Sequence, residues 1–273
     1  MAEYAVDPRV DGAILGVSVA WVLTAELVEF GEPEAIDTRG RVDLGLDQSV
    51  AEYLQLRWLL RDTEGITAAA TASDVIALAT VAAPAAYVGL TVLRAGPAEA
   101  SITPLAHAVI GLEGGMVALA VAEGFKLGVG AARPYVAACG DEPDCYAAMG
   151  VLDEVVLSDD GERVVAMTQE ARASFYSGHA SLVAGTSFAL AHVIATEGEP
   201  SVPRAVLAYG VAAGLTTSVA VLRVEAARHY PSDVIAGSVI GAGIGLTLAE
   251  LHQPSRRLRI VPAAGGAALT GTF

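Results

Sequence analysis

Residues Val234–Ala249 read VIAGSVIGAGIGLTLA, an apolar run without a charged side chain. Gly237, Gly241 and Gly245 recur at every fourth position in this run, which places them on one face of a helix. Small residues on one face let neighbouring membrane helices approach closely. A helix needs about 20 mostly apolar residues to cross a bilayer, and this run approaches that length when its polar ends are included. We therefore predict a membrane-spanning helix with a glycine-lined packing face.

Five further apolar stretches precede this run, so the chain has six in all. They are Gly12–Val28, Val75–Leu93, Ile102–Phe125, Ala180–Thr196 and Ala205–Leu222. Hydrophobic residues make up 53% of the 273 residues, and the mean hydropathy of +0.52 exceeds that of ordinary soluble domains. Alternating helix and strand signals are absent, which argues against an α/β fold. The sequence predicts an all-α polytopic membrane protein, a six-transmembrane-helix bundle. The alternative is a soluble, alanine-rich helical protein with buried core helices.

The charged residues indicate the orientation of the chain in the membrane. A basic cluster, PSRRLR, follows Gln253, and the positive-inside rule then places the C-terminus in the cytoplasm. Six spans place the N-terminus on the same side, so the loops after the first, third and fifth spans face outwards. The N-terminal stretch MAEYAVDPRVDG lacks the basic region of a cleavable signal peptide. We expect a location in the inner (cytoplasmic) membrane, one domain over residues 1–252, and a flexible cytoplasmic tail over residues 253–273.

The chain has two cysteines, Cys139 and Cys145, in the loop after the third predicted span. Their spacing is too wide for a CxxC redox pair, and no second Cys or His pair nearby completes a zinc site. We predict a disulfide that closes a short loop, with two free thiols as the alternative. A disulfide belongs outside the reducing cytosol, in agreement with the outward position of this loop.

Eight residues that can bind or transfer a phosphate collect at the span ends that face outwards. They are Lys126, Arg133, Ser177, Gly178, His179, Arg223, His229 and Asp233. An odd-numbered span ends on the side where the next span begins, so the topology brings all of them to one side of the membrane. The formal net charge of −15 argues against a nucleic acid as the partner.

These residue types suggest phosphoryl transfer to a histidine. Arg133 and Arg223 offer bidentate donors to a phosphate, and with Lys126 they neutralise its charge, so no metal is expected. Asp233 lies one helical turn after His229 and can accept a hydrogen bond from one imidazole nitrogen, which leaves the other nitrogen free to attack phosphorus. His179 can protonate the leaving alkoxide and later activate water.

The start of the fourth span completes the predicted phosphate site. It offers free backbone N–H groups and the positive end of a helix dipole, while Ser177 can donate its hydroxyl and Gly178 allows close backbone approach. Other titratable residues within the spans have simpler interpretations. His107 and His192 are interpreted as packing residues, and Glu113 and Glu123 leave open an ion or proton path.

Three motifs carry a resemblance to a known family. Lys126–Pro134 reads K-x6-R-P, residues 177–179 read S-G-H, and residues 223–233 read R-x5-H-x3-D. In this order the motifs resemble the tripartite signature of the type 2 phosphatidic acid phosphatase family. Its superfamily includes undecaprenyl pyrophosphate phosphatases, phosphatidylglycerophosphate phosphatases and vanadium haloperoxidases. The pattern departs from the family at Leu222, where serine is usual, and at Tyr176, where proline is usual.

The resemblance implies a role for each of the eight residues. His229 corresponds to the nucleophile that becomes phosphohistidine, Asp233 to its orienting acid and His179 to the general acid. The phosphate pocket corresponds to Lys126, Arg133, Ser177, Gly178 and Arg223.

These roles predict a membrane lipid phosphatase without metal or cofactor, with its catalytic core at about residues 100–250. Its partners are then the bilayer and a lipid phosphomonoester or pyrophosphate, with the active site on the outer (periplasmic) side. The alternatives are a vanadate-dependent haloperoxidase-like enzyme, which would be soluble, and a six-span transporter or binding protein that retains an anion pocket. The oligomeric state and the particular lipid stay open.

Overall fold

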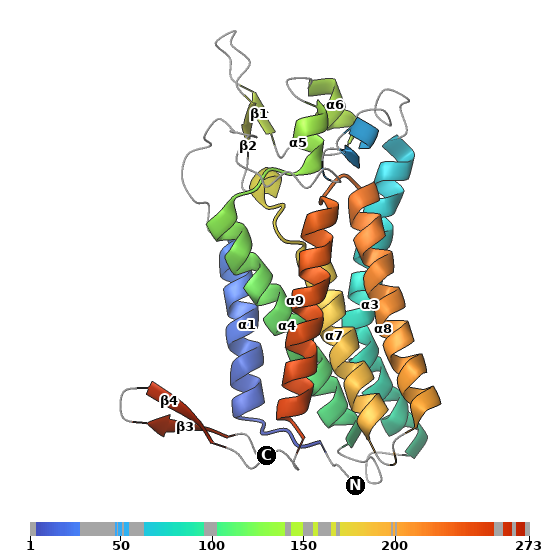
Figure 1. The fold of residues 1–273 in the computed structure, drawn as a ribbon, viewed down its shortest axis with the longest axis vertical. Helices are drawn as coiled ribbons and strands as arrows, with labels where there is room; N and C mark the ends of the chain where they lie inside the picture. The colour runs from blue at the N-terminus through green and yellow to red at the C-terminus, as the bar shows by residue number, and fades with distance from the viewer. Residues whose placement is uncertain are drawn as a thin grey trace.

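The computed structural model describes most of the chain, including all the long helices. It covers residues 4–27, 47, 49–50, 52–54, 63–95, 103–139, 143–149, 155–157, 165–167, 170–197, 199, 201–253, 259–263 and 266–270. The long helices are α1 (Val10–Leu27), α3 (Thr63–Ala95), α4 (Thr103–Val129), α7 (Gly178–Thr196), α8 (Val202–Glu225) and α9 (Pro231–Leu251). They run side by side along the long axis of the molecule (Figure 1). The predicted helical architecture is therefore observed in the bundle.

Short elements lie at both ends of the bundle (Figure 1). One end carries α5 (Pro134–Cys139), α6 (Pro143–Ala148), the 3-10 helix η3 (Glu170–Arg172) and a hairpin in which β1 (Val155–Leu157) pairs antiparallel with β2 (Val165–Met167). The other end carries a second antiparallel hairpin, β3 (Arg259–Ala263) with β4 (Gly266–Thr270). The segment predicted as a flexible tail thus contains a hairpin that the sequence did not suggest.

The helices of the bundle match the predicted apolar runs. Five of them, α3, α4, α7, α8 and α9, are long and apolar enough to cross a membrane, and α1 is a shorter apolar helix. The largest difference is in α3, which begins at Thr63 and not at the predicted Val75. Pro84 lies inside this helix, as it does in many membrane helices.

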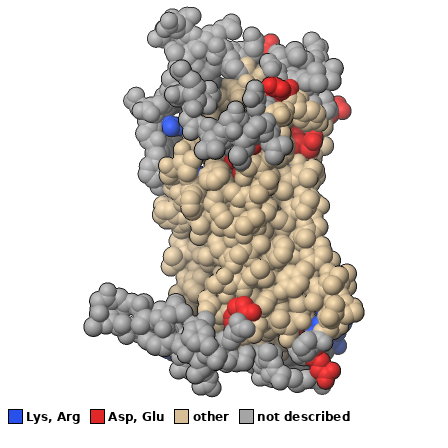
Figure 2. All heavy atoms as spheres, viewed as in Figure 1, with Lys and Arg blue, Asp and Glu red and all other residues tan. Residues whose placement is uncertain are grey.

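The middle of the bundle presents an apolar surface. Figure 2 shows a broad band without Lys, Arg, Asp or Glu, with charged side chains gathered towards the two ends. Large apolar side chains are exposed on all six long helices, among them Val17, Leu78, Leu207 and Val239. An exposed apolar surface of this extent is unfavourable in water and suits the hydrocarbon core of a bilayer. These features indicate a multi-pass membrane protein.

The α7 helix forms the centre of the bundle and packs against α4, α8 and α9. The glycine face of α9 lies directly on its backbone: Gly237, Gly241 and Gly245 face Ser177, Ser181 and Gly185, respectively. A methyl group added to Gly237 would lie 2.6 Å from the Ser177 carbonyl oxygen. On α4, a methyl group added to Gly114 would lie 2.6 Å from the carbonyl oxygen of Gly185. The close approach that the glycine spacing predicted therefore fixes the start of α7 against the start of α9.

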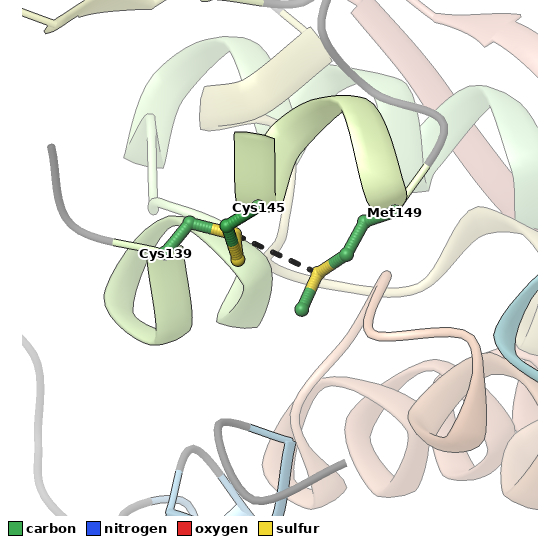
Figure 3. Close-up of a disulfide and its surroundings, with 3 residues drawn as sticks. All are labelled: Cys139, Cys145 and Met149. Carbon is green, nitrogen blue, oxygen red and sulfur yellow. Dashed lines mark hydrogen bonds between the residues drawn. A yellow bond between two sulfur atoms is a disulfide. The ribbon is translucent and has the colours of Figure 1, made fainter. Parts of the chain in front are cut away.

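A disulfide closes the segment that follows α4. Cys139 at the end of α5 is bonded to Cys145 in α6, and the Sδ atom of Met149 lies 3.8 Å from Cys139 Sγ (Figure 3). Both cysteines are buried with Tyr135 and Tyr146 in a small apolar cluster. The α5 and α6 helices, which carry these residues, lie at the end of the bundle at which α9 begins (Figure 1).

Candidate active site

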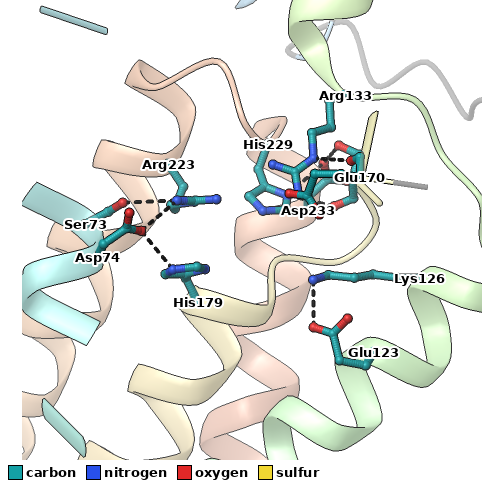
Figure 4. A network of polar contacts seen from close by, with 11 residues as sticks. Ser73, Asp74, Glu123, Lys126, Arg133, Glu170, His179, Arg223, His229 and Asp233 are labelled. Carbon is teal, nitrogen blue, oxygen red and sulfur yellow. Dashed lines mark hydrogen bonds and ion pairs between the residues drawn. The ribbon is translucent and has the colours of Figure 1, made fainter. Parts of the chain in front are cut away.

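The structure places all eight predicted residues at this same end of the bundle. Lys126 lies in the last turn of α4 and Arg133 just before α5, while Arg223 lies in the last turn of α8. His179 and Asp233 lie in the first turns of α7 and α9, and His229 lies in the link between α8 and α9. Figure 4 shows the charged ends of Lys126, Arg133 and Arg223 facing the two imidazole rings. Ser177 and Gly178 belong to the start of α7 beside them.

His229 is held with one ring nitrogen free. Its side chain is 1% exposed, and its Nδ1 lies 2.7 Å from the carbonyl oxygen of Ser174. A carbonyl oxygen only accepts, so Nδ1 carries the proton and Nε2 keeps its lone pair. Burial, and then the charges of Arg133, Arg223 and Lys126, lower the pKa of His229 well below its usual value of 6.5. His229 is therefore a neutral imidazole among cations, with an unprotonated nitrogen available for attack.

Asp233 supports His229 indirectly. Its Oδ2 lies 3.8 Å from His229 Nδ1, which is too long for a hydrogen bond. The same oxygen accepts hydrogen bonds from Ser174 Oγ at 2.6 Å and from the backbone N–H of Tyr230 at 2.9 Å. The prediction that Asp233 accepts directly from the imidazole needs this correction: Ser174 is the direct acceptor, and Asp233 holds Ser174 and the start of α9 in position.

Each of the three cations faces a carboxylate. Lys126 Nζ lies 2.7 Å from Glu123 Oε1, and Arg133 pairs with the Glu170 side chain while its Nε donates to the Glu170 carbonyl oxygen at 2.7 Å. Burial raises the pKa of Glu170, but Arg133 and then other nearby cations lower it more, so the net pKa is below its usual value. These carboxylates balance the positive charge of the cluster.

Two guanidinium nitrogens of this cluster have no hydrogen-bond partner in the part of the chain that the structure describes. They are Nη1 of Arg133 and Nε of Arg223, both buried. Buried polar groups normally find a partner, because an unmade hydrogen bond costs about 1–3 kcal/mol. A tetrahedral oxyanion offers acceptors for such donors. These two nitrogens fit the predicted phosphate site.

Asp74 joins an arginine to a histidine and was not among the predicted residues. Its Oδ1 lies 3.1 Å from Arg223 Nη1 and 2.9 Å from His179 Nε2 (Figure 4). The preceding residue, Ser73, lies with its Oγ 3.3 Å from the same Arg223 nitrogen. Both were missed because the second span was expected to begin only at Val75. The sequence signal was an acid directly before an apolar run, a position that Asp233 also occupies.

Ser177 and Gly178 shape the start of α7. Ser177 is the N-cap, and its Oγ accepts from the backbone N–H of Ala180 at 3.4 Å. A methyl group added to Gly178 would lie 3.3 Å from Lys126 Nζ and 3.1 Å from Glu123 Oε1. Glycine at this position lets the ion pair of α4 approach the start of the α7 helix.

The comparison with protein families decides the classification. The model described as the PAP2 superfamily matches residues 108–257, more than half of the chain. The chain belongs to the PAP2 superfamily. The matched region contains all eight predicted residues, and the resemblance seen in the three motifs is confirmed. No curated protein and no solved structure gave a match in the corresponding searches.

The two departures from the usual PAP2 motifs have visible structural settings. Tyr176, in place of proline, is buried with its ring centroid 5.3 Å from that of Phe125, and burial raises its pKa to about 12. Leu222 removes the hydroxyl that usually precedes the arginine of the third PAP2 motif. In this chain Ser73 of α3 brings a hydroxyl to Arg223 from another helix. Neither departure removes a charged or imidazole group from the cluster.

Proposed function

We propose that this PAP2 superfamily member is a six-span membrane phosphatase that hydrolyses a lipid phosphomonoester or pyrophosphate through a phosphohistidine. In this proposal α1 also crosses the membrane, which brings the number of spans from five to six. It is in contact with α4 inside the bundle, where Trp21 Nε1 donates to the carbonyl oxygen of Ala120 at 2.9 Å. Membership of the superfamily supports a phosphoric ester hydrolase in general.

In the first step, the substrate phosphate lies among the three cations, with Arg133 Nη1 and Arg223 Nε donating to its oxygens. The lone pair of His229 Nε2 attacks phosphorus, a P–N bond forms, and the P–O bond to the leaving group breaks. His179 gives a proton to the leaving oxygen, and Asp74 holds this imidazole in position. The products of this step are a dephosphorylated lipid, or a lipid monophosphate from a pyrophosphate, and phosphohistidine.

In the second step, water takes the place of the leaving group. His179, now neutral, accepts a proton from the water as its oxygen attacks phosphorus. The P–N bond breaks, inorganic phosphate leaves, and His229 regains its free Nε2. The charge that develops on phosphorus is stabilised by the three cations, so the chemistry proposed here requires no metal at phosphorus.

One observation carries this proposal: a buried neutral His229 with a free Nε2 shares a cluster with two guanidinium nitrogens that have no partner among the described residues. Structural ion-pair clusters normally satisfy their donors. The site also lies at one end of the apolar band, where a bilayer meets water (Figures 1 and 2). A lipid headgroup could reach the cluster there while its chains stay in the bilayer.

We also propose that the cluster faces the outer (periplasmic) side of the inner membrane. The disulfide between Cys139 and Cys145 lies at the same end as the cluster and belongs in an oxidising compartment. The basic stretch PSRRLR follows α9, whose last residues lie at the opposite end. The positive-inside rule assigns that opposite end to the cytoplasm.

The decisive experiment is phosphate release by the purified, detergent-solubilised protein from phosphatidate, phosphatidylglycerophosphate and undecaprenyl pyrophosphate. We expect at least one to be hydrolysed, and His229→Gln to lower kcat by more than about 1,000-fold. His192→Gln, a histidine of α7 remote from the cluster, is the matched control and keeps its activity. A chelator leaves activity unchanged well below the unfolding temperature. Substrate binding without phosphate release would favour a transporter or binding protein.

A further inference from the structure

A second buried polar cluster lies at the end of the bundle opposite the phosphate cluster. Asp11 belongs to the first turn of α1, Glu113 to α4, and His252 follows the last turn of α9. We propose that these three side chains form a binding site for a divalent transition-metal ion of the Zn²⁺ type. This proposal is independent of the phosphatase chemistry, which takes place at the other end.

The distances within the cluster suit such an ion. His252 Nε2 lies 3.4 Å from Asp11 Oδ1 and 3.2 Å from Glu113 Oε2, and one ligand atom from each residue falls within 4.8 Å of the others. Zn²⁺ binds nitrogen and oxygen ligands at about 2.0–2.2 Å in tetrahedral geometry, which separates the ligand atoms by about 3.3–3.6 Å. The cluster could therefore bind the ion with small side-chain movements, and a water could supply the fourth ligand.

The orientation of His252 is that of a metal ligand. Its Nδ1 lies 2.8 Å from the carbonyl oxygen of Leu248, so Nδ1 is the protonated nitrogen. Nε2 then faces two carboxylates and can supply its lone pair to a metal ion. Metal-bound histidines commonly donate their other ring N–H to a backbone carbonyl in this way. Asp11 is oriented similarly, because its Oδ2 accepts from the backbone N–H of Asp7 at 2.6 Å and leaves Oδ1 towards His252.

The charges of the cluster favour a cation, because two carboxylates face a single imidazole. Asp11 is 5% exposed and Glu113 0%, and within the described residues neither oxygen of Glu113 has a hydrogen-bond donor. Over the same part of the chain, no Lys or Arg forms an ion pair with either carboxylate. Two buried carboxylates this close to each other repel one another and lose their hydration. A divalent ion would satisfy all three groups at once.

Such an ion would connect three helices that are distant in sequence. It would hold the start of α1 and the end of α9 against α4, where Ala5 already donates its backbone N–H to the carbonyl oxygen of His252 at 3.2 Å. We therefore assign the site a role in stability and not in catalysis. Glu113, which the sequence left open as part of an ion path, acquires a specific role as a ligand.

The test is Zn²⁺ binding to metal-free protein in detergent, measured by calorimetry and as a shift of the unfolding temperature. All proteins carry His229→Gln, so that the histidine pair of the phosphate cluster cannot bind the ion. We expect about one Zn²⁺ per chain and a rise in unfolding temperature. Glu113→Gln should weaken binding by more than about 100-fold, since losing even an outer-shell partner costs up to about that much.

The matched control is His192→Gln. His192 is a histidine near the same end of the bundle, and its ring is hydrogen-bonded to Tyr209. Its replacement should therefore leave Zn²⁺ binding unchanged. Asp11→Asn, at the start of α1, provides a second ligand variant should Glu113→Gln fail to fold. Equal Zn²⁺ binding by the ligand variants and the control would overturn the proposal. So would a parent protein that takes up no Zn²⁺, since the cluster would then hold a proton in place of the ion.

Discussion

The backbone carbonyl oxygen of Ser174 accepts a hydrogen bond from His229 Nδ1 at 2.7 Å, while the hydroxyl of the same serine donates to Asp233 at 2.6 Å. One residue thus links the proposed nucleophile to the buried acid. Asp233 also accepts from the backbone N–H of Tyr230, next to His229. The carboxylate therefore fixes both the residue that orients the ring and the chain that carries it.

Replacing Asp233 by alanine should misplace His229 without affecting the cations. We expect kcat to fall by about 100-fold with little change in KM, because a shift of about 1 Å at the reacting atom costs this much. Asp233→Asn keeps an oxygen that can accept from Tyr230 and should recover part of the loss. Steady-state kinetics on folded variants measure kcat and KM. An unchanged kcat for Asp233→Ala would refute the role of Asp233 in positioning His229.

Asp74 should affect both catalysis and anion binding, since one oxygen contacts His179 and Arg223. In Asp74→Asn we expect kcat to fall by about tenfold, because the general acid loses its anionic partner. Inhibition by inorganic phosphate should become stronger, because Arg223 no longer has a competing carboxylate. Ser73→Ala is the matched control on the same helix, since Ser73 Oγ contacts Arg223 but is not bonded to the histidine. If both variants behave alike, the proposed role of Asp74 is wrong.

Stability should depend on pH through His229. Its folded-state pKa is lowered well below 6.5, so between these two values the unfolded chain binds a proton that the folded chain does not. The free energy of unfolding therefore rises with pH in this window, by up to about 1.4 kcal/mol per pH unit, and falls as the pH decreases below 6.5. Denaturant unfolding in detergent at several pH values should show this slope, and His229→Gln should reduce it. If the variant showed the same slope of unfolding free energy against pH, the pH dependence could not be assigned to His229.

The disulfide gives a prediction about the membrane side. In intact cells a membrane-impermeant thiol reagent should label Cys139 and Cys145 only after an impermeant reductant has been added. These are the two cysteines of the chain, so a variant with both replaced by alanine provides the background. Labelling without reduction would mean free thiols. If the reduced cysteines were labelled in lysed cells and not in intact cells, this end of the bundle would lie in the cytoplasm.

Much of the bundle could be predicted because lipid imposes a simple rule on sequence. A helix that crosses a bilayer must satisfy its own backbone and present apolar side chains, and each of the six apolar runs lies within or along a helix of the bundle. The alternation of direction then places Lys126, His179 and His229 at one end. The glycine spacing of α9 also indicated its packing face, since close approach requires small residues.

Other parts of the site had no signal that one sequence can supply. The apolar run of α3 marks only the part that contacts lipid, so the earlier turns with Asp74 were not recognised as helix. Ser174 accepts from His229 through its backbone carbonyl, which every residue has, and its hydroxyl reaches Asp233 only through tertiary packing. Glu170 belongs to a segment without periodicity and reaches Arg133 only through tertiary packing. Likewise, Glu113 and His252 are brought together only by the contact of α4 with α9.

The contact between α7 and α9 leads to a last prediction, with a control on the same helix. A methyl group on Gly241 would overlap the backbone of Ser181, with its Cα atom at 2.8 Å, and backbone atoms cannot yield as a flexible side chain does. Gly243 of the same helix has nothing within 4 Å of the corresponding position.

Gly241→Ala should therefore lower the free energy of unfolding by about 1–3 kcal/mol, the usual cost of overpacking. Gly243→Ala should raise it by up to about 1 kcal/mol, because alanine favours helix over glycine. Unfolding in detergent measures both. Equal stabilities of the two variants would show that α9 does not present its glycine face to α7. The start of α9, and with it Asp233 and His229, would then lack the support that this packing provides.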